Sequence, residues 1–221
     1  MNFMPYTGLQ WSDGWLLFDG LIATLIVTAL AAVAGTVLGV VLGVLREESR
    51  VMRWLLALPV DILRSVPLII QVILVNALLG IIGLRWEVLA VAVVALALYM
   101  AAFTSEIVRG GIKSVPLATR RAARSLGATS WTTFRRIYLP QTLPGMGAGA
   151  MLVFILAVGY YITPALVGGA DGQLFSNLIQ VHMRNSNWSM AAALSSMLLV
   201  GVLVLYWLYD RLVGVDNLKL G

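Results

Sequence analysis

The sequence predicts an all-α protein, a bundle of five transmembrane helices that forms a single domain over residues 1–221. Three observations predict this fold class. Hydrophobic residues make up 60% of the chain and charged residues 11%, against about 45–50% and about 25% in soluble domains. The apolar residues gather in five long stretches, and the mean hydropathy is +0.92. Basic residues favour the segments on one side of those stretches.

Each apolar stretch is close to the length that a membrane crossing requires, because about 20 residues rising about 1.5 Å each cover about 30 Å of hydrocarbon. The first stretch exceeds the core of a signal peptide and has no basic residue before it, so we expect a retained span. The third is short and charged residues follow it, so we expect it either to tilt little or to continue as a helix into water. The expected spans are Leu21–Leu45, Val66–Leu84, Val88–Ser105, Gly145–Leu166 and Met190–Tyr209.

Basic residues indicate the orientation, since Lys and Arg are retained on the cytoplasmic side. With the amino terminus outside and the carboxyl terminus cytoplasmic, the outer segments contain only Arg85 and Arg184. The other thirteen basic residues lie inside, namely Arg46, Arg50, Arg53, Arg64, Arg109, Lys113, Arg120, Arg121, Arg124, Arg135, Arg136, Arg211 and Lys219. The net charge of +5 therefore indicates membrane orientation and not nucleic-acid binding.

Charged residues near the inner membrane surface predict two local ion pairs. The segment between the first two spans is expected to lie along the inner interface and then turn inward, and its Asp61 and Arg64 are spaced to pair on one helix face. Glu106 is expected to pair with Arg109, three residues on, and not to contact a solute.

Glycines 35, 39 and 43 form a stripe at four-residue spacing on the first span. Such a stripe permits close approach of another helix. That helix belongs either to this chain, which is the interpretation we favour, or to a second subunit.

The residue inventory excludes several classes of activity. The chain has no cysteine and no G-x-x-x-x-G-K-[ST] motif, so a thiol nucleophile and a P-loop nucleotide site are absent. His182 is the only histidine and has no neighbouring ligand at metal spacing. Asp61 and Asp210 fall near the inner surface, not at the membrane depth that an aspartyl dyad needs. We therefore expect no catalytic residue, no metal and no cofactor in this chain.

Segment 106–143 is the long cytoplasmic segment and holds seven of the fifteen basic residues. Pro116 suits the first turn of a helix and Gly127 suits a helix end. Ser130 suits the cap of a second helix that stops before Pro140. The sequence therefore predicts two short helices joined at a glycine.

The first of these helices has small residues that let another surface approach closely. They are Ala118, Ala122 and Ala123. We expect a cytoplasmic partner to dock on Leu117 to Gly127, a segment that includes Arg121 and Leu126.

One spacing in this segment resembles the EAA loop of the membrane subunits of binding-protein-dependent ABC importers: that of Ala122, Ala123, Gly127, Ile137, Leu139 and Pro140. Segments 59–71 and 106–116 are similar to polar amino-acid permeases, whereas 152–169 is more similar to polyamine and opine permeases. One position departs from the motif, because Arg121 stands where the family has Glu.

This resemblance implies a type I ABC importer permease fold and a place in the bacterial inner membrane. It implies partners: a dimer of ABC ATPases that binds ATP and Mg²⁺, a second permease subunit, identical or homologous, and an extracytoplasmic solute-binding protein. The chain itself would be a transport subunit in contact with membrane lipid, and not an enzyme. The implied solute is a polar amino acid, an opine or a polyamine.

Polar residues at membrane depth usually face a bundle interior or a water-filled path. The candidates for a solute path are Gln71, Asn76, Tyr99, Tyr160 and Tyr161. Each has a structural alternative; Gln71, for example, lies one turn after Pro67 and could bond to the carbonyl groups that this proline leaves free.

A secondary transporter or channel that needs no ATPase is the alternative to an importer subunit. Such proteins usually carry mid-membrane acids or inverted repeats, and the sequence shows neither. A non-transporting scaffold is a third possibility, which the EAA loop disfavours.

Overall fold

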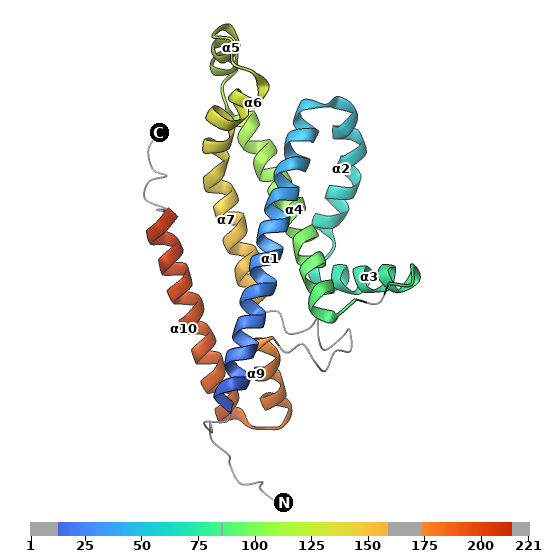
Figure 1. Ribbon diagram of the computed structural model, residues 1–221, viewed down its shortest axis with the longest axis vertical. Coiled ribbons are helices and arrows are strands. Elements are labelled where there is room, and N and C mark those ends of the chain that lie inside the picture. The colour runs from blue at the N-terminus through green and yellow to red at the C-terminus, as the bar shows by residue number, and fades with distance from the viewer. Residues whose placement is uncertain (1–12, 85, 159–173, 214–221) are drawn as a thin grey trace, which may run out of the picture.

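The computed structural model describes residues 13–84, 86–158 and 174–213. Four long helices run along its long axis: α1 (Asp13–Glu48), α4 (Val88–Ser114), α7 (Leu139–Val158) and α10 (Trp188–Val213) (Figure 1). Two short helices, α5 (Leu117–Ser125) and α6 (Ser130–Thr133), project beyond one end of the bundle. Helix α9 (Phe175–Arg184) lies at the other end. Helix α1 begins at the α9 end and α10 ends nearer the α5 end.

The glycine stripe of α1 packs against α4. A Cβ added at Gly35 would lie 2.7 Å from the Cβ of Met100, and one at Gly43 would lie 2.8 Å from the carbonyl oxygen of Ser105. Small residues at these positions let the two backbones approach closely, which is how helices associate where lipid removes the hydrophobic driving force. The interpretation that the stripe packs within the chain is confirmed.

Helices α3 and α7 pack against other faces of α4. Helix α3 (Leu68–Ile81) contributes Val72 to a buried apolar cluster with Val91 and Ala95 of α4. On α7, Met146 packs with Val108 and Ile112 of α4. Helix α4 is therefore the centre of the bundle, and it continues to Ser114, which confirms the expected extension of the third span.

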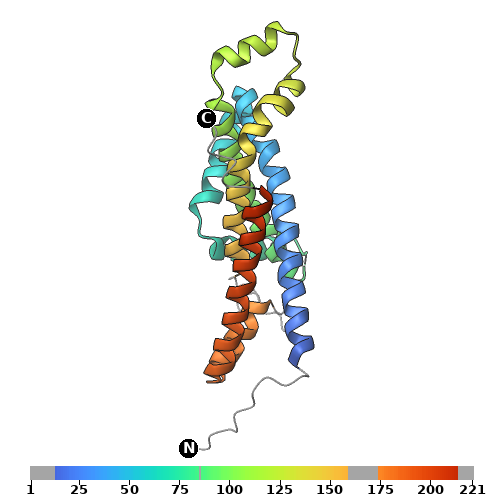
Figure 2. The same ribbon diagram turned by 90° about the vertical axis from the view of Figure 1, so that its left-hand side faces the viewer.

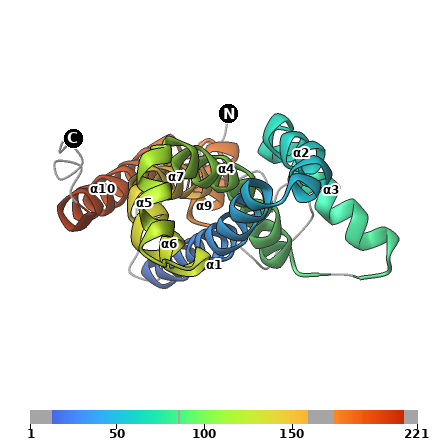
Figure 3. The same ribbon diagram turned by 90° about the horizontal axis from the view of Figure 1, so that it is seen from above.

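Helices α2 (Arg50–Ser65) and α3 form a bent pair, with an angle of 117° between them. Ser49 separates α1 from α2, and its hydroxyl accepts the Met52 N–H at 3.3 Å. Helix α2 then runs back beside α1 instead of lying across its end, and α3 projects sideways (Figures 1 and 3). The bend falls at Pro67, whose preceding residue is disfavoured in helical conformation.

At the opposite end from α5, α9 joins α1 and α10. The Phe175 backbone N–H donates to the buried Thr24 hydroxyl at 3.0 Å. Leu17, Leu178 and Leu194 form an apolar cluster with their neighbours on the same three helices. Helix α9 is thereby held against the start of α1.

Three helices in the described ranges are long and apolar enough to cross a membrane: Leu17–Glu48, Val88–Ser114 and Trp188–Leu208. The bent pair α2–α3 would be a fourth. Helix α3 has 14 residues, about 21 Å of rise, so it is too short to span alone. The expected fourth span begins within α7, but its remainder, 159–166, lies outside the described residues. The count of five spans stays a prediction.

Candidate functional site

The projecting element begins with α5, whose ends the sequence defines. Pro116 precedes the helix, where its missing N–H costs nothing. At the other end the Gly127 N–H donates to the Arg124 carbonyl and the Ala128 N–H to the Ala123 carbonyl, each at 3.0 Å. These two bonds form a Schellman motif, which needs a left-handed residue, and Gly127 has φ +76°. The predicted glycine turn is confirmed.

Helix α5 exposes apolar side chains far from the membrane-facing helices. Leu117 is 65% exposed and Leu126 is 87% exposed, and Ala122 is also exposed. Figure 2 shows α5 extending across the end of the bundle. Ala123 differs from the expectation, because it is buried and faces the molecule. The surface open to a partner is therefore built from Leu117, Ala122 and Leu126, with the exposed Arg121 among them.

The segment after α5 differs from the expectation at both ends. The cap of α6 is Thr129, one residue before Ser130, and its hydroxyl accepts the Thr132 N–H at 3.2 Å. The helical path does not stop before Pro140. It passes through a π turn, η1 (Phe134–Tyr138), directly into α7. A wider π turn lets the chain continue helically at a proline that would clash in a regular helix interior.

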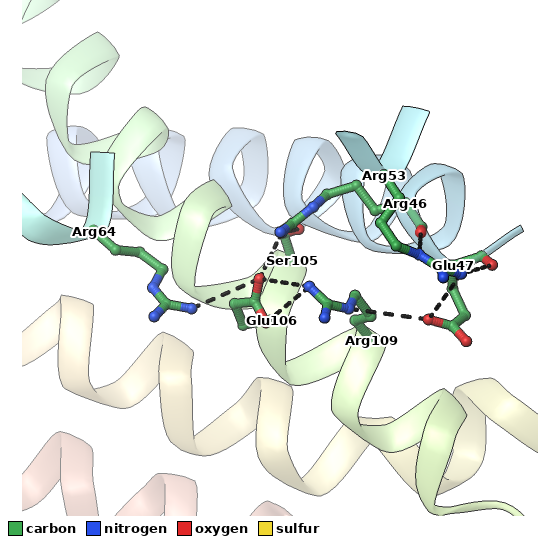
Figure 4. A network of polar contacts seen from close by, with 7 residues as sticks. All are labelled: Arg46, Glu47, Arg53, Arg64, Ser105, Glu106 and Arg109. Atoms are coloured by element: carbon green, nitrogen blue, oxygen red, sulfur yellow. Dashed lines mark hydrogen bonds and ion pairs between the residues drawn. The ribbon is translucent and has the colours of Figure 1, made fainter. Parts of the chain in front are cut away.

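A cluster of charged residues joins α1, α2 and α4 at the end of the bundle nearest α5 (Figure 4). Arg46 is 2% exposed, and its Nη1 lies 2.6 Å from Glu106 Oε1 and 3.1 Å from Ser105 Oγ. Arg109 Nη1 lies 3.2 Å from the same Glu106 oxygen, which confirms the expected pair. Arg64 Nη1 lies 3.7 Å from the same Glu106 oxygen, so Arg64 pairs with Glu106. The expected pair of Arg64 with Asp61 is not formed among the described residues.

Arg53 completes the charge cluster by capping α1. Its Nε donates to the Arg46 carbonyl and its Nη2 to the Glu47 carbonyl, each at 3.0 Å. The Glu47 carboxylate lies 3.9 Å from Arg53 and 4.0 Å from Arg109. The position of Arg46 in the sequence indicates its burial, because Arg46 follows Gly43 by three residues and thus continues the glycine stripe.

Among the candidate path residues, Gln71 has a structural role. The Leu63 carbonyl would normally bond to the N–H of residue 67, but Pro67 has none. The Gln71 side-chain amide donates to Leu63 O and, at 3.2 Å, to Val66 O. The hydrogen-bonding interpretation of Gln71 is confirmed, although its buried Oε1 has no partner in the described part of the chain.

The remaining path candidates are not joined to Gln71 by a hydrogen bond within the described residues. Asn76 is half-buried on α3. Tyr99 is half-buried on α4 and packs against Phe103 in a tilted arrangement, with ring centroids 4.8 Å apart. Tyr160 and Tyr161 lie outside the described residues.

Several helices long and apolar enough to cross a membrane define a polytopic membrane protein, here with an exposed helix beyond one end of the bundle. The chain belongs to the family of binding-protein-dependent transport system inner membrane components, whose family model matches residues 35–214. The matched region runs from the glycine stripe of α1 to the end of α10.

Several curated proteins resemble parts of the chain. The spermidine/putrescine transport system permease protein PotB of Salmonella typhimurium (strain SL1344) is 40% identical over 97 residues, 42% of this chain and 34% of PotB. The nopaline transport system permease protein NocM of Agrobacterium fabrum is 39% identical over 133 residues, 53% of this chain and 55% of NocM. The probable glutamine ABC transporter permease protein GlnP of Bacillus subtilis is 34% identical over 131 residues, 59% of this chain and 60% of GlnP. The chain thus matches about a third of PotB's length.

Solved structures share the whole fold. A chain of the MetNI methionine ABC transporter in an inward-facing conformation aligns with TM-score 0.75 and 25% identity, covering 93% of this chain and 98% of that one. A chain of a bacterial alginate ABC transporter aligns with TM-score 0.74 and 18% identity, covering 96% of this chain and 85% of that one. The fold is that of the type I ABC importer permeases, as expected.

Proposed function

We propose that the chain is the permease subunit of an ATP-driven importer for a polar amino acid or a related small nitrogenous solute, such as an opine or a polyamine. The named solutes of the similar permeases, spermidine/putrescine, nopaline and glutamine, are all nitrogen-rich. Two ATPase subunits supply the energy, so the chain carries out transport and not hydrolysis. A second permease subunit completes the path, and an extracytoplasmic binding protein delivers the solute.

The observation that carries this proposal is the exposed face of α5. Large apolar side chains exposed to water are unfavourable unless a partner covers them. Leu117 and Leu126 are exposed at the two ends of α5, the helix that projects beyond the bundle end. The Schellman motif at Gly127 fixes the direction of the helix, so the apolar face is presented as a rigid surface. A cleft of an ATPase subunit is the occupant that we assign to it.

The connections of α5 explain how movement of that partner reaches the membrane helices. Two residues, Val115 and Pro116, connect α4 to α5, and Val115 is buried. On the other side, α6 and η1 lead without a break into α7. Helices α4 and α7 also contact each other, since a Cβ at Gly145 of α7 would lie 2.8 Å from the Ile107 side chain. A displacement of α5 therefore moves both helices together, as rigid-body alternation requires.

Arg121 is exposed on α5 at the position of the family's Glu. An arginine there needs an acidic or carbonyl acceptor on the ATPase, whereas a glutamate needs a donor. We therefore expect Arg121→Glu to weaken coupling in this protein, even though it restores the family motif.

The docking proposal is tested by Ala122→Trp in the reconstituted importer. The side chain is exposed, so the free subunit accepts the larger residue, but a close-fitting cleft does not. We expect a loss of more than tenfold in ATPase stimulation by loaded binding protein. The matched control is Ala192→Trp, an exposed alanine near the α9 end of α10, which should leave stimulation unchanged. Full stimulation in Ala122→Trp would show that the ATPase docks elsewhere.

The proposed orientation is tested separately by impermeant thiol labelling, for which a chain without cysteine is a clean background. Cysteines replacing the exposed Gly14 and Leu126 should react from the outside and from the cytoplasm, respectively. Labelling of both from one side would refute the orientation.

A further inference from the structure

The charge cluster is unbalanced. Nitrogens of Arg46, Arg109 and Arg64 lie 2.6, 3.2 and 3.7 Å from one oxygen of Glu106. One carboxylate carries a single negative charge, so three guanidinium groups around it repel each other. Glu47, 3.9 Å from Arg53 and 4.0 Å from Arg109, supplies a second negative charge to the cluster, but its four arginines still leave excess positive charge. Arg46 is 2% exposed, and its Nε has no hydrogen-bond partner among the residues that the structure describes. A buried donor without a partner is costly, so the cluster favours a further anion.

An open cavity of about 390 Å³ adjoins this excess charge. Four cationic and two anionic side chains line it, namely Arg46, Arg53, Arg64, Arg109, Asp61 and Glu106. Their net charge is +2, and it is +1 when Glu47, which pairs with Arg53 and Arg109, is counted with them. Its wall also includes Trp54, which is 78% exposed. The cavity thus combines arginine donors, which suit phosphate oxygens, with an aromatic ring at its edge.

The position of the cavity places it at a membrane surface. Arg46 directly follows the apolar stretch of α1, and Glu106 directly follows that of α4. The adjoining face of α2 carries a stripe of exposed apolar side chains at three- and four-residue spacing, which begins at the cavity edge with Trp54 and includes Val51, Leu55, Leu58 and Ile62. Such a helix has one polar face toward the cavity and one apolar face for lipid chains.

We propose that this cavity binds the phosphate headgroup of an anionic phospholipid from the cytoplasmic leaflet. The arginines hold the phosphate oxygens, Trp54 lies at the level of the headgroup as aromatic residues prefer, and the acyl chains lie along Leu58 and Ile62. The bound lipid balances the charge that Glu106 leaves uncompensated and links α2 to α1 and α4. The leaflet follows from the proposed orientation, whereas binding itself is independent of transport.

A soluble phosphate offers the arginines the same phosphate oxygens, but it has no acyl chain that could cover the apolar stripe. A zwitterionic phospholipid has the phosphate but adds a cation that four arginines repel. The geometry therefore favours a lipid with net negative charge over both.

Native mass spectrometry of the purified full-length chain in detergent tests the proposal, with phosphatidylglycerol, phosphatidylcholine and inorganic phosphate as probes. We expect retained phosphatidylglycerol in excess of phosphatidylcholine. Arg64→Gln should weaken phosphatidylglycerol binding about fivefold, the effect of one arginine near a charged lipid surface. Asp61→Asn should strengthen it, because it removes a negative charge from the cavity. Arg211→Gln, at the end of α10 beside Trp207, is the control and should leave binding unchanged.

Three results would overturn the proposal. Equal retention of the two phospholipids would show that the excess charge is not used. Displacement of phosphatidylglycerol by equimolar inorganic phosphate would assign the cavity to a soluble anion. An equal loss in Arg64→Gln and Arg211→Gln would attribute binding to general surface charge. The Asp61→Asn variant keeps the test decisive if Arg64→Gln fails to fold, because weaker or unchanged binding there contradicts the charge argument.

Discussion

Replacing Gly39 by alanine should push α1 away from α4. A Cβ at this position would lie 2.5 Å from the Cβ of Thr104 and 2.8 Å from the carbonyl oxygen of Ala101. Both atoms are attached directly to the α4 backbone or belong to it, so no side-chain rotation relieves the overlap. The two helices must separate, and the contacts at Gly35 and Gly43 on either side would loosen with them.

The size of the effect follows from two opposing contributions. Overpacking a well-packed site costs about 1–3 kcal/mol. Alanine is better than glycine in a helix interior by up to about 1 kcal/mol. We therefore expect Gly39→Ala to lower the free energy of unfolding by about 0–2 kcal/mol, and thus to be less stable than a Gly→Ala change without the overlap.

The assay is the unfolding of the purified chain in mixed micelles titrated with a denaturing detergent. The matched control is Gly201→Ala in α10, where nothing lies within 4 Å of the added Cβ. This control receives the helix-propensity gain without the overlap, so it should stabilise the chain by up to about 1 kcal/mol. If Gly39→Ala were as stable as the control, the close contact of α1 and α4 would be refuted.

For three further substitutions the structure determines whether the chain becomes more or less stable. Ser186→Gly should stabilise the chain by about 0.5–1 kcal/mol, because Ser186 closes α9 at φ 57°, where a side chain is penalised; thermal unfolding measures it. Gln71→Leu should destabilise by about 1–3 kcal/mol, since it leaves the Leu63 carbonyl unpaired, whereas the exposed Gln141 should tolerate the same change in the same assay. Gly127→Val should cost about 1–2 kcal/mol through φ alone, because a Cβ there meets nothing within 4 Å, and it should also reduce ATPase stimulation.

The sequence predicts features that depend on local chemistry. Pro116 and Gly127 define the ends of the projecting helix, Glu106 reaches Arg109 within one helix, and Pro67 frees a carbonyl for Gln71. Each of these depends on residues within two turns of one another, so spacing alone is sufficient to predict them.

Features that depend on which helices become neighbours are not predictable in this way. Arg64 contacts Glu106 of α4, and not the nearby Asp61, because α2 runs back beside α4. Ala123 is buried because one side of α5 lies against the rest of the molecule. The nine residues of that helix do not by themselves determine which side this is. The helical path continues past Pro140 by means of a π turn over Phe134–Tyr138. Those five residues are ordinary in helices, so the sequence gives no clear signal for this turn.

The π turn at Phe134–Tyr138 also affects how the chain tolerates a deletion. Its bond from the Leu139 N–H to the Phe134 carbonyl encloses one residue more than an α turn does. Because the extra residue is taken up within the turn, removing a single residue there would restore α geometry and leave the segments before and after it in nearly the same rotational relation. The π turn therefore holds one residue that the direction of the projecting element does not require: a deletion within Phe134–Tyr138 would leave that direction nearly unchanged, whereas a deletion in the middle of α7 would rotate the element by about 100°.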